Sequence, residues 1–150
     1  DDIAAAIYPV GFYRTKARHL KQLPEVLEQQ FGGEIPDSIE KLVRLPGVGR
    51  KTAALVVAAS FGKPAICVDT HVHRISNRLG LVKTRSPAAT EQALQDILPR
   101  RYWKLWNPLL VAFGQRICRP IKPRCATCPI RAFCALGRTS ERGAASVERF

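Results

Sequence analysis

The sequence reads Leu-Pro-Gly-Val-Gly-Arg-Lys-Thr from Leu45 to Thr52, between two segments that we expect to be short helices, 38–44 and 50–61. Gly47 and Gly49 stand one residue apart, which lets the backbone turn tightly and lets another molecule approach it closely. The second helix begins at Arg50 and presents its first N–H groups and the positive end of its dipole beside that turn. The stretch therefore predicts a hairpin between two helices that can hold a phosphate.

A simpler interpretation of this hairpin competes with DNA binding. A plain helical hairpin also carries glycine at its corner, and a Gly-x-Gly pattern alone would indicate nothing more. The flanking Leu and Val, in a chain with a formal net charge of +12, favour DNA as the ligand. Because backbone amides do not read bases, we expect sequence-independent binding through Gly47, Val48, Gly49 and Arg50.

The composition fits a basic, folded domain. Hydrophobic residues make up 46% of the 150, enough for a core, and residues 100–150 hold eleven Lys or Arg against two acids. The sequence shows neither an apolar run long enough to span a bilayer nor a signal peptide, so we expect a soluble protein. We expect it in the cytoplasm near the nucleoid if it is bacterial, with a nuclear or mitochondrial location left open.

Glycine and proline divide the chain into helical segments. Apolar spacing of three or four indicates a helix over 14–30, and a short helix is expected over 1–8. Further helices are predicted over 70–79, over 86–98 starting at Ser86-Pro87, and from Asn107-Pro108 into Cys118. Residues 65–68 are apolar and extended in type. Because no alternating strand pattern of useful length occurs, the sequence predicts an all-α fold.

Lys51 lies in the first turn of the helix that follows the hairpin. The positive end of the helix dipole disfavours a charged amine there, and a neutral amine is what nucleophilic attack on carbon requires. An ion pair with a phosphate beside the hairpin is the plainer explanation, and position alone favours it.

Asp69 stands between the apolar run Ala65–Val68 and the helix that begins at Thr70. A carboxylate at such a junction is usually an N-cap, and it can also be a group held at a cleft. Both roles are compatible, because the N–H groups that a cap accepts fix the carboxylate and keep it ionised.

Four of the five cysteines follow one another as Cys118-x6-Cys125-x2-Cys128-x5-Cys134. Disulfides are not expected in an intracellular chain, so this pattern favours a metal site. Structural zinc usually takes two Cys-x-x-Cys-like pairs, whereas this loop has one, and its uneven spacing suits a cubane iron–sulfur cluster while leaving zinc as a rival. Cys67 is predicted to be buried in the core.

Together these motifs resemble one family. The runs LPGVGRKTA and VDTHVHR and the cysteine spacing are similar, in order and separation over residues 1–136, to the endonuclease III branch of the helix-hairpin-helix DNA glycosylases. The resemblance implies two helical domains with a cleft between them: 1–63, the C-terminal part of a six-helix barrel, and 64–136, ending in the cluster loop. Residues 137–150 are expected to form a flexible tail. Relatives carry further helices upstream, so we expect this chain to be a piece of a longer protein.

The resemblance also implies an activity, that of a bifunctional DNA glycosylase and abasic-site lyase that removes oxidised pyrimidines. Lys51 matches the lysine that attacks C1′ of a flipped nucleotide, and Asp69 matches the aspartate that stabilises the developing positive charge on the sugar. The implied partner is double-stranded DNA with damaged bases or abasic sites, bound by a monomer. The family's [4Fe-4S] cluster is held by the cysteines that match Cys118, Cys125, Cys128 and Cys134, which argues against zinc.

Other matches to the family are weaker. Gly47 and Gly49 match the hairpin that grips a phosphate 3′ of the lesion. The basic loop of the family matches residues 118–125, with Arg119, Lys122 and Arg124. Phe12 matches an apolar wedge that fills the gap left by the flipped base, and ordinary core packing is an equal alternative. Structural roles are expected for His71 and His73, and core packing for Trp103 and Trp106.

Two other functions stay open at this point. A monofunctional glycosylase of the adenine-removing kind shares the hairpin, the aspartate and the cluster but usually lacks the lysine, so Lys51 argues against it. A non-catalytic DNA-binding remnant of the fold is the second alternative.

Overall fold

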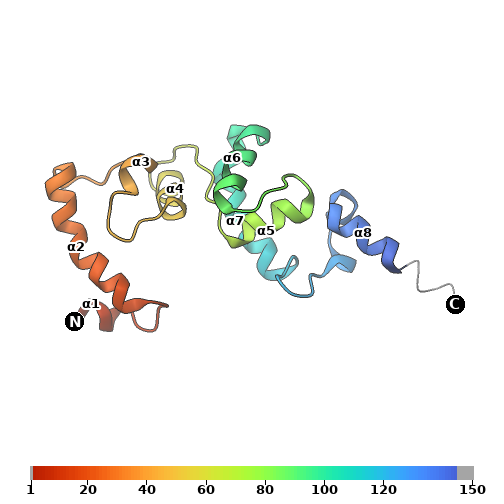
Figure 1. Cartoon of the computed structure of the whole chain (residues 1–150), viewed down its shortest axis with the longest axis horizontal. Coiled ribbons are helices and arrows are strands. Elements are labelled where there is room, and N and C mark those ends of the chain that lie inside the picture. Colours follow the sequence, from red (N-terminus) through yellow and green to blue (C-terminus); the bar gives the residue numbers. More distant parts are fainter. Residues whose placement is uncertain (1, 145–150) are drawn as a thin grey trace. The chain divides into compact units, whose positions relative to one another are not determined.

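The computed structural model describes the backbone of residues 2–144 and the side chains of residues 2–139. Every regular element within this part is a helix, which confirms the all-α fold class (Figure 1). The chain divides after Lys63 into two compact units.

The first unit, residues 1–63, has its small core under the hairpin. Its helices are α1 (Asp2–Ala6), α2 (Tyr13–Phe31), α3 (Ile39–Leu42) and α4 (Arg50–Ala59). Buried apolar residues come from α3, α4 and the turn between them: Leu42, Leu45, Ala53, Ala54 and Val57. The long helix α2 contributes no buried residue. The best-packed part of this unit is therefore the part that carries the hairpin.

Side chains tie α2 to the segment that precedes the hairpin. The Arg44 guanidinium donates a hydrogen bond to Gln30 Oε1 (3.0 Å) and lies 5.2 Å from the centre of the Phe31 ring. The Ser38 hydroxyl accepts a hydrogen bond from the Lys41 amide (3.4 Å) and caps the start of α3. The contacts of Arg44 hold the helix–turn–helix segment against the end of α2.

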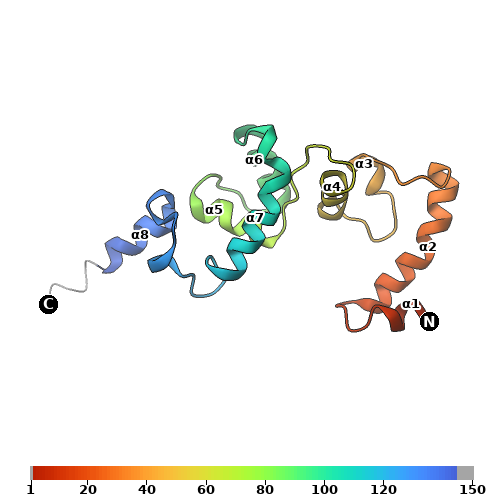
Figure 2. The ribbon, with the colours of Figure 1, turned by 180° about the vertical axis from the view of Figure 1, so that it is seen from behind.

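The second unit starts at Pro64. It contains α5 (Thr70–Leu79), α6 (Pro87–Ile97), α7 (Trp103–Arg116) and α8 (Ala135–Ala144), with the 3-10 turns η1 (Arg100–Tyr102), η2 (Cys125–Thr127) and η3 (Arg131–Phe133). Helices α5 and α7 pack against each other, as the view from behind shows (Figure 2).

One continuous apolar core holds the second unit together. It consists of Ile66, Val68, Val72, Ile75, Leu94 and Leu110, and Trp103 and Trp106 pack against it as predicted. The extended run Ala65–Val68 is fully buried, and Cys67 is 3% exposed, which confirms its assignment to the core. Asn107 binds this run from α7, because its Nδ2 donates to the Cys67 carbonyl (3.1 Å).

The start predicted for the helix at Asn107-Pro108 is wrong. Helix α7 begins at Trp103 and contains Pro108 in its interior. The Trp103 indole donates a hydrogen bond to the Leu98 carbonyl (2.8 Å), and η1 leads directly into the helix. These two features fix the start of α7 at Trp103, although Pro108 would be a favourable first residue of a helix. Proline in a helix interior costs one backbone hydrogen bond, and α7 tolerates that loss.

The C-terminal end of the chain also differs from expectation. Helix α8 runs from Ala135 to Ala144, so residues 137–144 of the expected tail are helical, and residues 145–150 lie outside the described part.

Candidate functional site

Gly47 is required by the hairpin itself. Its φ of +74° lies in the left-handed region, and a Cβ at this position would lie 2.5 Å from His19 Nδ1 on α2. A residue with a side chain would therefore be both strained and in collision with the imidazole. The hairpin is packed against α2 through the one position where no side chain fits.

Gly49 is not required by the protein in the same way. Its φ of −87° and ψ of 171° are open to any residue, and a Cβ there would have no atom within 4 Å. Gly49 stands at the start of α4 and has no side chain of its own with which to cap this helix. The absence of a side chain at Gly49 thus leaves room for a molecule that approaches from outside, as a phosphate does.

Lys51 lies in the first turn of α4 and is exposed. The neighbouring Arg50 is exposed as well, so two cations stand directly after the hairpin.

Asp69 is the N-cap of α5, as the sequence predicted. Its Oδ1 accepts a hydrogen bond from the Val72 amide at 2.8 Å, and its own backbone is extended. The side chain is partly exposed, so the cap fixes the carboxylate while leaving it accessible. Lys51 belongs to the first unit and Asp69 to the second, and a joint site for the two stays a prediction.

All four cysteines of the predicted metal site line one cavity of the second unit. Besides the cysteines, the cavity is lined by apolar residues and by three arginines: Leu79, Phe113, Ile117, Pro123, Ile130 and Leu136, with Arg78, Arg124 and Arg131. The cysteines carry free thiols. They lie on short turns after α7, where Cys125 begins η2 and Cys134 follows η3.

The chemistry of these four thiols suits a metal centre. In the described residues, no three Cys, His, Asp or Glu side chains are already placed to hold one metal ion. Thiolates that line one cavity are suitable ligands for either zinc or an iron–sulfur cluster. The assignment to a cluster stays a prediction.

The loop between Cys118 and Cys125 presents its basic side chains to solvent. Arg119, Lys122 and Arg124 are exposed, and Ile121 at the tip is 80% exposed. The base of the loop is closed by the Arg124 amide, which donates to the Ile117 carbonyl (2.9 Å). Lys122 has a φ of +50°, a left-handed conformation that is uncommon for a residue with a side chain.

Phe12 does not belong to the core of the described structure. Its side chain is 88% exposed, and its φ of +58° places it at the turn before α2. Within the described part of the chain no apolar surface covers the ring, and the alternative of core packing in a longer protein is not tested. The role as a wedge stays a prediction.

The histidines of α5 have local partners. His73 Nδ1 is 2.6 Å from the Thr90 hydroxyl, and Thr90 is fully buried on α6. His71 Nδ1 is 3.1 Å from Arg74 Nη2 on the same helix. These contacts agree with the structural roles expected for both rings.

Two arginines that the sequence analysis did not single out reach the cysteine loop from α5. Arg74 Nη2 donates to the Cys118 carbonyl (3.0 Å), and Arg78 binds the next residues of the loop. Their spacing of four places both side chains on one face of the helix, which was the available signal. The sequence could not show that these arginines bind the cysteine loop, because the loop lies about forty residues further along the chain.

Comparisons with known proteins point to DNA repair. A family profile described as "HhH-GPD superfamily base excision DNA repair protein" matches residues 1–100. Endonuclease III of Thermotoga maritima is 48% identical over 143 residues, which cover 95% of this chain and 67% of that protein. Endonuclease III-like protein 1 of Bos taurus is 50% identical over 139 residues, and the chain spans 46% of its length.

Two solved structures match the fold closely. One is described as "Structure of a Trapped Endonuclease III-DNA Covalent Intermediate: Estranged-Adenine Complex" and the other as "Structure of a non-covalent Endonuclease III-DNA Complex". Each has a TM-score of 0.86 and 39% sequence identity, and the matches cover 94% of this chain and 67% and 66% of those chains. None of the helices described for this chain is long and apolar enough to cross a membrane.

Proposed function

This chain belongs to the endonuclease III family within the HhH-GPD superfamily of base excision DNA repair proteins, and on that premise we propose that it takes part in a bifunctional DNA glycosylase and abasic-site lyase. The observation that carries the proposal is Lys51, an exposed lysine in the first turn after the glycine hairpin. The chain is similar to a protein that has been trapped covalently on DNA. The proposed substrates are oxidised pyrimidines in double-stranded DNA. The protein is proposed to bind them as a monomer, in a compartment that contains DNA.

The proposed division of labour follows from the residues. The open backbone at Gly49 and the start of α4 hold a phosphate of the damaged strand. Chemistry at a sugar carbon requires the nucleotide to leave the stack, and Phe12 supplies an exposed ring for the gap. The basic residues Arg119, Lys122 and Arg124 add contacts to the backbone of the DNA.

The proposed reaction uses Lys51 and Asp69. The neutral Lys51 amine attacks C1′, a nitrogen–carbon bond forms, and the glycosidic bond breaks as the base leaves with a proton. Positive charge develops on the sugar, and the capped carboxylate of Asp69 is available to stabilise it. The C1′–O4′ bond then breaks, its electron pair goes to O4′, which takes a proton and stays on C4′ as a hydroxyl, and a Schiff base forms at C1′. Removal of a C2′ proton then expels the 3′ phosphate by β-elimination.

We propose that Cys118, Cys125, Cys128 and Cys134 hold a [4Fe-4S] cluster. The support is the set of four free thiols that line one cavity, with the spacing Cys118-x6-Cys125-x2-Cys128-x5-Cys134. When bound, such a cluster supplies one-electron redox chemistry and cross-links the segment that holds it. The basic loop between Cys118 and Cys125 would then be fixed at both of its ends. Iron and sulfide analysis of anaerobically purified protein tests this, and a colourless zinc protein would refute it.

Borohydride trapping on DNA with an abasic site tests the reaction. A covalent protein–DNA adduct is expected, and Lys51→Gln should abolish it while binding to a reduced abasic analogue persists. Lys41→Gln, which removes an exposed lysine of α3, is the matched control and should trap like the wild type. Asp69→Asn keeps an oxygen that can cap α5 but removes the charge, so it should slow base release without unfolding the helix.

The same assay separates the alternatives. Base release without strand scission and without an adduct would indicate a monofunctional glycosylase of the adenine-removing kind. DNA binding with neither base release nor scission would indicate a non-catalytic protein. Normal trapping by Lys51→Gln would move the nucleophile to another residue.

A further inference from the structure

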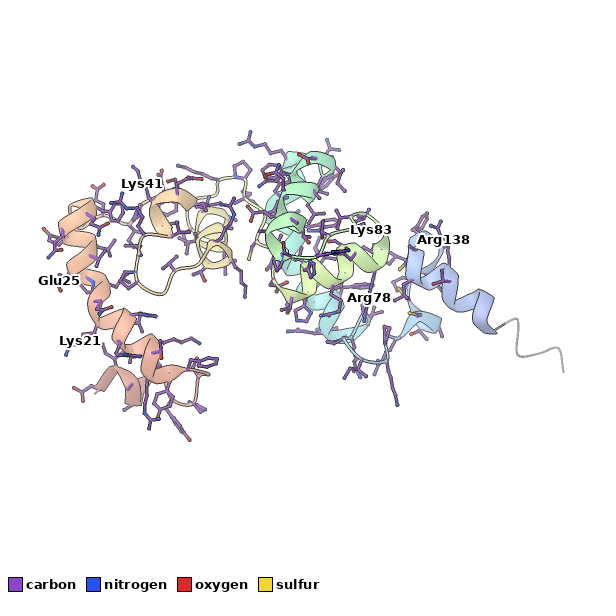
Figure 3. The ribbon with its side chains drawn as sticks, viewed as in Figure 1. Lys21, Glu25, Lys41, Arg78, Lys83 and Arg138 are labelled. Atoms are coloured by element: carbon purple, nitrogen blue, oxygen red, sulfur yellow. The ribbon has the colours of Figure 1, made fainter. Side chains whose placement is uncertain are left out.

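Arg78 lies in the last turn of α5 (Figure 3) and binds three consecutive residues of the cysteine loop. Its Nη1 donates to the Arg119 carbonyl at 2.6 Å, and its Nη2 donates to the Pro120 carbonyl at 2.7 Å. Nη1 also lies 3.6 Å from Cys118 Sγ. One partly buried guanidinium thus contacts a proposed cluster ligand and the first two carbonyls of the basic loop.

The geometry of this contact depends on the guanidinium fork. Two neighbouring carbonyl oxygens that point at one place repel each other unless a donor stands between them, and the planar fork offers two parallel N–H groups. A lysine ammonium carries the same charge on a flexible stem but cannot reproduce the fork. The position therefore requires arginine for its shape and not only for its charge.

The contact limits how the loop can move. The Arg124 amide closes the base of the loop on Ile117, and Arg78 fixes Arg119 and Pro120 just after Cys118. Between these two attachments only the tip at residues 121–123 is left, where Ile121 and Lys122 are exposed. The side chain of Arg119 points to solvent while its carbonyl is held by Arg78.

We propose that Arg78 is a positioning residue that couples the Cys118 sulfur to the conformation of the DNA-binding loop, because a single guanidinium holds both. The proposal rests on the function proposed above and adds to it a residue that acts on DNA through Arg119 and Lys122. It also adds an N–H group directed at one cluster ligand, and hydrogen bonds to the sulfurs and nearby charge raise the reduction potential of such clusters.

The test compares Arg78→Lys and Arg78→Gln with Lys83→Gln in the intact protein. Lys83 is an exposed cation of the same unit and serves as the charge-matched control (Figure 3). The measurements are iron content, the midpoint reduction potential, hydrogen–deuterium exchange of residues 117–125, and affinity for a duplex with a reduced abasic site. Arg78→Gln replaces Arg78→Lys if the lysine variant does not fold.

We expect Arg78→Lys to keep its iron, because the four thiols remain. Exchange at residues 117–125 should be faster, the potential lower, and the affinity for DNA weaker than that of the wild type, because the loop no longer holds the phosphate-contacting side chains in place. Lys83→Gln should leave all four readouts unchanged.

A double-mutant cycle shows whether Arg78 acts through the loop. Once Arg119→Ala and Lys122→Ala have removed the two basic side chains through which Arg78 is proposed to act, Arg78→Lys should weaken DNA binding no further. An additive loss would mean that Arg78 touches DNA itself and would overturn the proposal. Wild-type affinity and exchange in Arg78→Lys would also overturn it, since charge alone would then suffice.

Two further results also count against the proposal. If both Arg78 variants fail to fold, Arg78 is a residue of the core and not a positioning residue. If wild-type protein forms no borohydride adduct, the proposed function fails, whereas a trapped wild-type adduct with normal binding by Arg78→Lys refutes only the role of Arg78.

Discussion

The two units of this chain prepare their functional residues in different ways. In the first unit the important group is backbone: Gly47 makes the turn possible and Gly49 leaves it open, over a core of a few small residues. In the second unit the important groups are side chains, Asp69 and the four cysteines, placed by helices around one continuous core. A hairpin that binds phosphate through amides needs little support beyond its own turn. A set of four thiols from separate turns needs a rigid framework.

The largest expected difference concerns packing. Leu94 is fully buried in the core of the second unit, and Leu94→Ala should lower the free energy of unfolding by about 2–5 kcal/mol. Leu20 on α2 is 45% exposed, and Leu20→Ala should cost less than about 1 kcal/mol, since surface substitutions rarely cost more. Urea denaturation measures both. An equal cost at the two positions would show that the contrast between the units is false.

The next difference lies within the hairpin. Gly47→Ala places a Cβ in a left-handed residue and against His19, so it should destabilise the first unit by roughly 1–3 kcal/mol. Gly49→Ala meets no atom and should leave stability within about 0.5 kcal/mol of the wild type. Thermal unfolding of both variants checks the expected stabilities. The affinity for DNA, measured separately, should fall in both variants. Normal DNA binding by Gly49→Ala would remove Gly49 from the phosphate site.

Local signals explain how far the sequence alone could go. Helix α5 has the predicted bounds because Asp69 caps its start and Gly80, at a φ of +81°, ends it, and both are properties of neighbouring residues. Helix α6 likewise begins with Ser86 as cap and Pro87 in the first turn. The start of α7 was missed because the Trp103 indole binds Leu98 and outweighs the signal from Pro108.

The residues of the site also differ in whether local sequence patterns reveal them. The hairpin and the cysteine spacing are short-range patterns, so Gly47, Gly49 and the set of four cysteines could be named from the sequence. The contacts of Arg78 join residues about forty positions apart, and periodicity or capping carries no information on them. The exposure of Phe12 could not be predicted either, because an aromatic residue beside a helix start is as compatible with a core as with a surface.

A smaller effect is expected at the cap of α5. Asp69→Ala removes the acceptor of the Val72 amide and should cost about 1 kcal/mol, within the usual 0.5–2 kcal/mol for N-caps. Asp69→Asn should be nearly neutral for stability, because its oxygen can accept the same hydrogen bond. Thermal unfolding of the two variants therefore measures the structural role of Asp69. The glycosylase assay measures the effect of removing its charge. A large loss of stability in Asp69→Asn would contradict this separation.

The smallest effect concerns an ion pair of the first unit, between Lys63 and Asp37. The Lys63 ammonium donates a hydrogen bond to the Asp37 carboxylate, and this bond, with the attraction between the charges, lowers the pKa of Asp37 below its ordinary value of 3.8. A carboxyl whose pKa is lower in the folded state stabilises the fold at pH values above 3.8 and loses that contribution as the pH falls through the folded pKa.

Both side chains of the Lys63–Asp37 pair are about half exposed, so salt should screen the pair. Lys63→Gln should therefore be slightly less stable than wild type near neutral pH in low salt, with the difference vanishing in acid or in high salt. Denaturation midpoints near neutral pH and in acid measure the difference, with Lys21→Gln, at another exposed lysine of the first unit, as the control. A difference that persists in acid would mean that Lys63 stabilises the unit by packing and not through Asp37.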